Sequence, residues 1–575
     1  MNETSKVSLL WPNEEIKEEY KDLISISNRT AADLGMEQIA QGISINSKYE
    51  GDCMRILRQL CNDEETIHYR LDIVDDFVRN PNLSAQMESI LPQLRKLYSL
   101  NDKKSIIGAE PLRMIAWQTE TLGLYIDIAA ALKEILDSFQ DVIHSEGLKR
   151  LHLFLIKLTN GETYQSMLSE IPQIREKLQS MSSITLGINL DEEFKPTEAI
   201  FLSAESKNVK KKRSFISSIL GLNSADEPFE GISQYKSIIK INHAPLEKVL
   251  LRCLEEIFHE TLKPVSESLQ KYIQINTRVL TDLEFEIAFF VGASRFIQRL
   301  TANGLKLCKP QAMPKDDRSF VIKQLTDVWL AQKFVHQLSE VDLERIIVDN
   351  DVYFGPDARI FILTGPNQGG KTTYTRAIGL AQVLFQAGMF VPGVQARISP
   401  VDWIFTHFSE EETPNADHGR LGEESKKLAE IFHKATPHSL LLLNESLSST
   451  SPRDSYYLAR ELVKGMKLIG CRAVFTTHIL DLAADADQIN QELPTEDQIV
   501  SMTAGIDENE SAGNASEKDA AKRTYKVVPG PPRGMSFAKD IARKHGLSLE
   551  QMIETLRQRQ IIDFHIDTEK RSHDM

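Results

Sequence analysis

The 575-residue sequence predicts a multidomain protein in which a mostly helical region is followed by an α/β domain. Three observations support this prediction. Up to about residue 335, apolar residues recur three and four positions apart, with few Gly or Pro inside the segments. From about residue 336, short apolar runs alternate with helical stretches, which favours a largely parallel sheet. A glycine-rich turn follows one of these runs, where a strand would pass into a helix.

Helical periodicity is clearest in two long segments. Residues 51–78 and 244–275 carry apolar residues at helical spacing with little interruption. Residues 246–303 fit either one very long helix or two stacked helices interrupted near Pro264, and the pattern leaves both open. We predict that residues 1–335 form the helical region.

A small insertion interrupts the helical region. Residues 184–204 alternate apolar and polar positions around a polar turn, which predicts a pair of strands, and we assign residues 184–235 to the insertion. It contains the run KNVKKKR, with five basic residues in seven. Such a run is either a solvated loop or a contact to phosphate, because clustered Lys and Arg supply most of the sequence-independent affinity for DNA. The candidate DNA-binding residues are Lys207, Lys210, Lys211, Lys212 and Arg213.

Residues 336–575 are predicted to form the α/β domain. Residues 503–520 are polar and acidic, and we expect a flexible loop there. A helix-rich segment precedes the polar C-terminal tail. The strand candidates are residues 360–364, 403–408, 440–443, 473–477 and 498–506.

Composition and charge exclude several classes of protein. The net charge of −15 is uneven, since residues 481–520 hold eleven acidic residues and one lysine. An acidic total leaves nucleic-acid binding open but argues against coating DNA by charge alone. The five cysteines form no CxxC pair, which argues against a disulfide framework or a zinc cluster. No apolar run approaches the ~20 residues that span a bilayer. The N-terminus does not resemble a secretory signal, so we expect a cytoplasmic protein without a membrane partner.

The strongest signal is the segment FILTGPNQGGKTT, which satisfies the pattern GxxxxGK[ST]. A strand candidate before it and a helix candidate after it argue against a chance glycine-rich turn. In this arrangement backbone N–H groups surround phosphates at a helix N-terminus. Lys371 would neutralise the outer phosphates, and the Thr372 hydroxyl would bind Mg²⁺. The predicted nucleotide-binding residues are Gly365, Pro366, Asn367, Gln368, Gly369, Gly370, Lys371, Thr372 and Thr373.

A second motif ends the strand candidate LLLLNES. In nucleotide hydrolysis the first acidic position after such a strand usually holds the metal, and the second orients or deprotonates the attacking water. Glu445 can act as that base. Asn444 can accept a hydrogen bond from a metal-bound water but brings no negative charge, so we expect weaker magnesium binding and slower turnover. His478 ends another strand candidate, FTTH, and can contact the terminal phosphate, although a lone histidine is more often structural.

These motifs resemble those of the MutS family of DNA mismatch repair ATPases. TGPNQGGKTTYTRAIGLAQVLFQAGMFVPG is similar to the family loop TGPNMGGKST and the helix after it. ATPHSLLLLNES is similar to ATPxSLVLLDE, with Asn444 at the family Asp and Glu445 at its Glu. TTHILDL is similar to ATHYHEL, with His478 at the family histidine. YKVVPGPPRGMSFAKDIARKHGLS resembles the closing segment YxLxPGxxxxSxGxxxAxxxGxP, and the ordered match covers most of residues 345–550.

The resemblance implies a P-loop ATPase domain of ABC-like type, preceded by core and lever helices with a DNA clamp at the insertion. It implies ATP and Mg²⁺ as cofactors. Glu445 and His478 would be catalytic, and Thr372 and, through water, Asn444 would contact the metal. DNA and a second copy of the chain are the implied partners, with a DNA repair protein as a further one. The implied function is ATP binding and hydrolysis that switch a helical DNA clamp.

Three departures from the family pattern point to a shortened, divergent member. The core-like region starts almost at once in the sequence, so we expect a member without the family's mismatch-reading domain. Residues 418–428 replace the family's GxSTF segment and keep only Glu424, and Asn444 replaces an aspartate. An alternative interpretation is a nucleotide-binding adaptor with little hydrolysis that holds branched nucleic acid or a protein partner. A translation or ribosome-associated clamp is a third.

Overall fold

The structure of this protein, a computed structural model, comprises two compact units. One unit contains Met1–Asn13 and Arg79–Val291, and the other contains Glu14–Val78 and Gly292–Met575. This division by contacts differs from the boundary at residue 335, which stays a prediction about domains. The described residues are 7–20, 23, 25–101, 111–179, 183–193, 196–205, 238–240, 265–269, 271–272, 275, 277–338, 342–408, 420–447, 451–506, 523–532 and 549–559.

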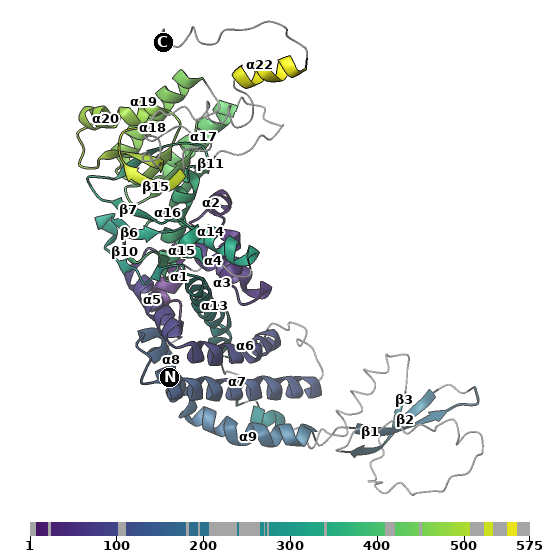
Figure 1. Ribbon diagram of the computed structural model, residues 1–575. Coiled ribbons are helices and arrows are strands. Elements are labelled where there is room, and N and C mark those ends of the chain that lie inside the picture. Colours follow the sequence, from purple (N-terminus) through teal and green to yellow (C-terminus); the bar gives the residue numbers. More distant parts are fainter. Residues whose placement is uncertain are drawn as a thin grey trace, which may run out of the picture. The chain divides into compact units, whose positions relative to one another are not determined.

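The first unit is mainly helical (Figure 1). Its principal helices are α6 (Pro81–Asn101), α7 (Pro111–Phe139), α8 (Glu146–Thr159) and α9 (Glu162–Gln179). The long helix α7 packs against each of the other three. Their apolar faces are buried, as at Leu94, Leu132 and Leu151. The helical character predicted for this part of the chain is confirmed.

The expected strand pair near residue 184 is present in an antiparallel sheet of order β1-β2-β3 (Figure 1). Ile184 pairs with Ala204. The basic run 207–213 lies outside the described residues. The three strands are β1 (Ser183–Leu190), β2 (Pro196–Glu205) and β3 (Ile238–Lys240).

The segment 246–303, which fitted either one helix or two, is not one continuous helix. Residues 271 and 272 form a turn, and residue 275 is not helical. Helices resume at α12 (Arg278–Thr281) and α13 (Leu283–Ala302).

The second unit is built on a six-stranded sheet of order β11-β12-β13-β8-β14-β15 (Figure 1). All neighbouring pairs are parallel except β14 with β15. The predicted α/β architecture is therefore confirmed, with a mixed sheet. The strands are β8 (Ile360–Thr364), β11 (Ile404–Phe408), β12 (Leu440–Asn444), β13 (Arg472–Thr476), β14 (Ile499–Ile506) and β15 (Arg523–Pro529).

Two stretches of chain supply the helices of the second unit. The helices are α1 (Glu14–Tyr20), α2 (Asn28–Asp33), α3 (Met36–Ile43), η1 (Ser47–Tyr49), α4 (Glu50–Gln59), α5 (Glu64–Arg79), η3 (Lys315–Asp317), α14 (Val328–Gln337), α15 (Leu343–Ile346), α16 (Lys371–Gln386), α17 (Arg420–Lys434), α18 (Pro452–Ile469), α19 (Leu480–Ala484), α20 (Ala486–Glu492) and α22 (Leu549–Gln558). Helix α2 packs on the edge strand β11, and α4 packs on α16. The N-terminal helices therefore belong to the same compact unit as the sheet.

Helices cover both faces of the six-stranded sheet. Side chains alternate along a strand, so Leu441 and Leu443 face one side, where they join a buried cluster with Val463 of α18. Leu442 faces the other side, toward α16. A Cβ added at Gly379 of that helix would come within 2.8 Å of Leu442 Cδ1. A strand buried on both faces has a continuous apolar sequence, which is why LLLL marked this strand.

Smaller sheets flank this core. One has the order β5-β10-β6-β7, and the other pairs β4 with β9. Their strands are β4 (Leu307–Cys308), β5 (Gln311–Ala312), β6 (Phe320–Leu325), β7 (Asn350–Phe354), β9 (Val391–Pro392) and β10 (Gln395–Ile398). Among the helices of the described residues, none is long and apolar enough to cross a bilayer.

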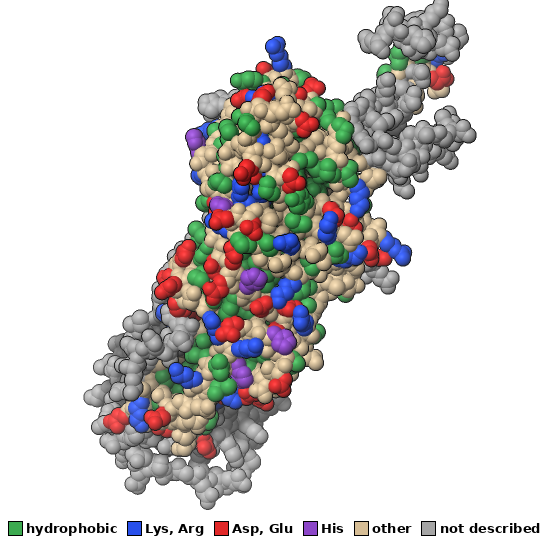
Figure 2. Space-filling model, turned by 90° about the vertical axis from the view of Figure 1, so that its left-hand side faces the viewer, with side chains coloured by type: hydrophobic (Ala, Val, Ile, Leu, Met, Phe, Trp, Pro, Cys, Tyr) green, Lys and Arg blue, Asp and Glu red, His purple; other side chains and the backbone are tan. Residues whose placement is uncertain are grey.

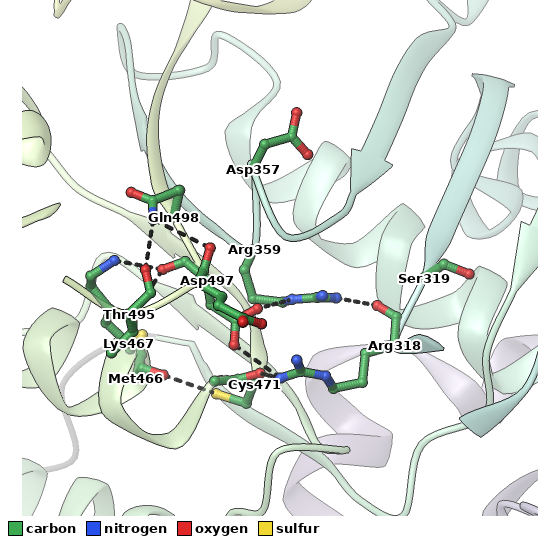
Figure 3. A network of polar contacts seen from close by, with 12 residues as sticks. Arg318, Ser319, Asp357, Arg359, Met466, Lys467, Cys471, Thr495, Asp497 and Gln498 are labelled. Atoms are coloured by element: carbon green, nitrogen blue, oxygen red, sulfur yellow. Dashed lines mark hydrogen bonds and ion pairs between the residues drawn. The ribbon is translucent and has the colours of Figure 1, made fainter. Parts of the chain in front are cut away.

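A network of charged side chains links the amino ends of β8 and β14 to Arg318 (Figure 3). Asp497 accepts a hydrogen bond from Arg359 Nε at 2.9 Å and another from Arg318 Nη1 at 3.0 Å. Its backbone carbonyl accepts from Lys467 Nζ at 2.5 Å. Gly470 has a φ of +74°, and a Cβ added there would lie 2.5 Å from the Asp497 carboxylate. This position therefore requires glycine for conformation and for space.

We expect Asp497→Ala to lower the free energy of unfolding by about 3 kcal/mol, because it leaves the buried guanidinium of Arg359 and the half-buried one of Arg318 without their carboxylate. Urea unfolding followed by circular dichroism measures the loss. The matched control is Glu496→Ala, whose side chain is exposed at the preceding position, and which should change stability by no more than about 0.5 kcal/mol. Equal stability of the two variants would contradict the role given to the network.

Candidate nucleotide-binding site

The parallel strands bring three sequence motifs to one edge of the sheet. Leu363 of β8 lies opposite Thr476 of β13, and Thr476 lies opposite Asn444 of β12. The carboxyl ends of parallel strands meet at the same edge, where α/β proteins bind ligands. The glycine-rich loop, Glu445 and His478 are therefore neighbours, although they are far apart in the sequence.

The glycine-rich loop uses backbone conformations that favour glycine. Gly365 and Gly370 have φ values of +141° and +94°, and Gln368 has a φ of +59°. A Cβ added at Gly365 would also lie 2.7 Å from the Cβ of Ala504. Gly370 caps α16, so the helix begins at Lys371. The loop thus places the positive dipole end of a helix at the sheet edge, as an anion site requires.

Lys371 is buried and bound by its own loop. Its Nζ donates to the carbonyl oxygens of Gly365 at 2.9 Å and Pro366 at 3.2 Å, and it lies 3.7 Å from Oε1 of Glu445. Burial lowers the pKa of this ammonium group, while the Glu445 carboxylate acts in the opposite direction. A phosphate beside Nζ would favour the charged form further, so the position suits an anionic ligand.

Asn444 joins the start of α16 to the second motif. Its Oδ1 accepts hydrogen bonds from the hydroxyls of Thr372 at 3.2 Å and Thr476 at 2.8 Å. The backbone N–H of Glu445 donates to both the carbonyl and the hydroxyl oxygen of Thr476, each at 3.0 Å. Thr372 and Asn444, the two residues predicted to contact the metal, therefore lie in direct contact. Both present uncharged oxygen atoms, and oxygen is the donor that Mg²⁺ prefers.

Glu445 lies between Lys371 and His478. Its Oε1 is 3.2 Å from His478 Nε2. The hydrogen bond with His478, followed by the charge of Lys371, holds the pKa of Glu445 below its usual value, although partial burial acts the other way. Its φ of +54° is uncommon for a residue with a side chain. The carboxylate is therefore ionised at neutral pH, as a general base must be.

A cavity of about 400 Å³ lies beside the loop, within the range typical of ligand sites. Loop residues and Glu445 line one part of it, and Tyr525 of β15 lines another. Asn350 of β7 donates to the Tyr525 carbonyl at 3.2 Å and accepts from the Val527 N–H at 2.7 Å, which fastens this wall. The cavity thus lies between a glycine-rich loop of the kind that binds phosphate and a wall of apolar side chains. Its apolar lining includes Leu330, Phe334, Ile346, Ile347 and Val348.

The structure brings most of the predicted site residues together. Gly365 forms the first turn of the loop, and Asn367 is exposed and does not line the cavity. Glu445 lines it and holds His478 beside it. The predicted DNA-binding residues lie outside the described residues. The loop residues that line the cavity are Pro366, Gln368, Gly369, Gly370, Lys371, Thr372 and Thr373.

Sequence reasoning missed side chains that support the second motif from other elements. His407 of β11 places Nδ1 2.8 Å from Ser446 Oγ, and Glu424 of α17 accepts the Leu447 N–H at 2.7 Å. Burial, followed by the charge of Arg29, lowers the pKa of His407 to about 4. No local pattern indicates such contacts, because the partners come from distant strands and helices. Of these side chains, only Glu424 was singled out from the sequence, because it keeps its place relative to the family's GxSTF segment.

Two domain families match the chain. Residues 62–303 match the family described as MutS2 N-terminal domain, and residues 361–547 match MutS domain V. The chain belongs to the MutS family. The resemblance drawn from the motifs is thereby confirmed. The glycine-rich loop, Asn444, Glu445 and His478 all lie within the MutS domain V match.

Individual MutS relatives match different shares of the chain. It is 24% identical over 553 residues to the DNA mismatch repair protein MutS of Chlorobium phaeobacteroides, which covers 92% of this chain and 58% of the relative. It is 35% identical over 147 residues to the DNA mismatch repair protein MutS 2 of Halobacterium salinarum, and this match covers 25% of the chain and 17% of the relative. It is 26% identical over 297 residues to the Endonuclease MutS2 of Streptococcus gordonii, and this match covers 48% of the chain and 36% of the relative. In each comparison this MutS-family chain spans less than two thirds of the relative.

The buried His407 should make stability depend on pH. Its pKa of about 4 in the folded protein is below the ordinary 6.5, so the unfolded chain binds more protons between these values and stability falls as the pH decreases. From about pH 7.5 to about pH 5, the wild type should lose about 2 kcal/mol more unfolding free energy than His407→Gln. Urea unfolding at both pH values measures this difference.

The control for that experiment is His433→Gln, which removes an exposed histidine of α17 and should keep the pH dependence of the wild type. If His407→Gln and the wild type lost stability in parallel, His407 would not be held neutral in the folded protein.

Proposed function

We propose that this MutS-family chain binds ATP with Mg²⁺ and hydrolyses it, and that binding and hydrolysis switch a helical DNA clamp in mismatch repair or related DNA maintenance. The observation that carries the proposal is the convergence of Lys371, Thr372 and Glu445 at the cavity beside the glycine-rich loop. A buried ammonium, a hydroxyl and an ionised carboxylate are the groups that phosphoryl transfer to water requires.

The nucleotide would lie along the cavity. Its phosphates would face residues 365–373 and replace the loop carbonyls as partners of Lys371 Nζ. The apolar wall near Ile347 and the ring of Tyr525 would hold the base, since flat apolar surfaces bind flat ligands. The strand order and the loop support assignment of the domain to the ABC-like P-loop type. The domain limits of 1–335 and 336–575, with the clamp at 184–235, are part of this proposal.

Hydrolysis would use Glu445 as the general base. Its carboxylate is ionised and hydrogen-bonded to His478. His478 would contact the terminal phosphate and hold the attacking water beside that carboxylate. The protein would contribute to catalysis mainly by positioning the reactants and by electrostatic stabilisation, because phosphoryl transfer needs little covalent chemistry from the protein.

Magnesium fits the residues present at the site. The ion supplies positive charge to the phosphate oxygens, and the Thr372 hydroxyl would be its protein ligand. Asn444 would contact it through water while orienting the Thr372 hydroxyl, to which it is hydrogen-bonded. Because Asn444 brings no charge, most of the attraction for the ion would come from the nucleotide itself.

The DNA part of the proposal is supported by the relatives and by the basic run 207–213. Two of the relatives described above are named for DNA mismatch repair. On the face shown in Figure 2, Lys and Arg side chains are interspersed with Asp and Glu rather than gathered. We also propose a homodimer, as the resemblance implies, and a DNA repair protein as a further partner.

A second candidate function is a nucleotide-binding adaptor that hydrolyses ATP very slowly. Asn444 favours it, because the site lacks one of the two carboxylates usual in such ATPases. In this case the chain would hold branched nucleic acid or a protein partner in its ATP-bound state.

Turnover of variants at the second motif separates the two candidates. Glu445→Ala should keep ATP binding and lower kcat by about 10²- to 10⁴-fold, because it removes the base. Asn444→Asp should lower the Mg²⁺ concentration needed for ATP binding, because it adds a charged oxygen ligand. Phosphate release and ATP titration measure these effects. A wild type as slow as Glu445→Ala would favour the adaptor, and an unchanged magnesium requirement in Asn444→Asp would contradict the role given to Asn444.

Reversal of charge at Lys210, Lys211, Lys212 and Arg213 to Glu should weaken DNA binding and flatten its dependence on salt, because fewer counterions are released. Fluorescence anisotropy with duplex, mismatched, branched and single-stranded DNA, with and without ATP, measures both quantities. The control reverses Lys323, which is exposed and paired with Asp351. An unchanged salt slope in the fourfold variant would remove the basic run from the DNA site.

A further inference from the structure

The buried hydroxyl of Thr476 joins the two functional positions of the second motif. Thr476 is fully buried and lies opposite Asn444 in the parallel register of β12 and β13. Its Oγ1 donates to Asn444 Oδ1 at 2.8 Å and accepts from the Glu445 backbone N–H at 3.0 Å. One side chain therefore contacts both the residue expected beside the metal and the residue expected to act as base.

An asparagine at position 444 creates a problem of orientation that an aspartate does not. The amide carries an oxygen on one side and an NH₂ group on the other, and its hydrogen-bond partners decide which faces where. If the NH₂ group faced Thr372, its hydrogens would point toward the position of the cation and repel it. A carboxylate has an oxygen on each side, so either orientation presents an acceptor.

The contacts of Thr476 favour the orientation with the oxygen toward Thr372. Its oxygen accepts the Glu445 N–H, and its own proton is directed at Asn444 Oδ1. The second lone pair of Oδ1 remains for the Thr372 hydroxyl, at 3.2 Å, or for a metal-bound water. With both hydroxyls donating to the same atom, the amide oxygen faces Thr372 and Thr476.

We propose that Thr476 is a positioning residue for the magnesium-nucleotide site. It holds the Asn444 amide with its oxygen toward Thr372, and this lets an asparagine serve where an aspartate is usual. The inference rests on the proposed ATP function. Thr476 and Asn444 stand where the resembling motifs ATHYHEL and ATPxSLVLLDE have alanine and aspartate, so these two differences from the quoted motifs are in direct contact.

The test is a double-mutant cycle with Thr476→Val and Asn444→Asp. Valine keeps the shape of threonine without the hydroxyl, and the Glu445 N–H keeps its bond to the carbonyl of residue 476. A fluorescent ATP analogue is titrated in EDTA and over a range of Mg²⁺ concentrations. We expect Thr476→Val to raise the Mg²⁺ concentration for half-maximal binding about tenfold, without changing binding in EDTA.

Three comparisons complete this test. Thr476→Ser, which keeps the hydroxyl, should restore the magnesium dependence. In the Asn444→Asp background, Thr476→Val should shift the dependence by no more than about threefold, because a carboxylate needs no orienting donor. Thr503→Val removes a buried hydroxyl in β14, opposite the last residue of β8, that bonds only to loop carbonyls in the described structure, and it should behave as wild type.

The outcomes separate the inference from the proposed function. Equal effects of Thr476→Val in the two backgrounds, or equal loss of binding with and without Mg²⁺, would show a merely structural role and overturn the inference alone. A wild type that binds the analogue neither with nor without Mg²⁺ would overturn the proposed function, and the inference with it.

Discussion

Parallel pairing of β8, β13 and β12 is the constraint on which the candidate site depends. Side chains alternate along a strand, so a shift of one residue would turn Asn444 to the opposite face of the sheet and separate it from Thr372. The register is fixed by burial, since the five residues of each of these strands are all buried. The free energy that aligns the motifs therefore comes mainly from apolar packing by helices on both faces. The polar side chains at the carboxyl ends of these strands are therefore aligned by packing elsewhere along the strands.

Charged side chains at the two ends of these strands have different kinds of partners. At the amino ends, Asp497 accepts hydrogen bonds from the side chains of Arg359 and Arg318. At the carboxyl ends, Lys371 donates to loop carbonyls and lies 3.7 Å from Glu445. Ion pairs within the protein stabilise the fold, whereas an ammonium group held by backbone carbonyls can exchange them for a ligand with little rearrangement. The amino ends of the strands therefore serve stability, and the carboxyl ends carry the candidate site.

The parts of the candidate site that the sequence indicated are local, and the structure brings them to one edge of the sheet. The glycine-rich loop needs special backbone angles over six residues, and the apolar run before Asn444 is typical of a buried strand. The support of these motifs is not local. Thr476 and His407 act on the second motif from neighbouring strands, and their contacts exist only once the strand order is known. The break at residues 271–275 was likewise not indicated, because apolar spacing continues on both sides of it.

Loss of the carboxylate at position 444 changes the charge of the site before any ligand arrives. Lys371 and Glu445 balance each other, and Asn444 adds nothing to them. An aspartate in its place would make the site net negative, so that a polyphosphate could approach only with a cation to offset the repulsion. With Asn444, the phosphates of the proposed nucleotide would meet a site in which the charges of Lys371 and Glu445 cancel. We therefore expect Lys371 to contribute more to phosphate binding, and the metal less, than in a site with an aspartate. The orientation of the Asn444 amide, proposed to be held by Thr476, would then act on the metal together with the Thr372 hydroxyl.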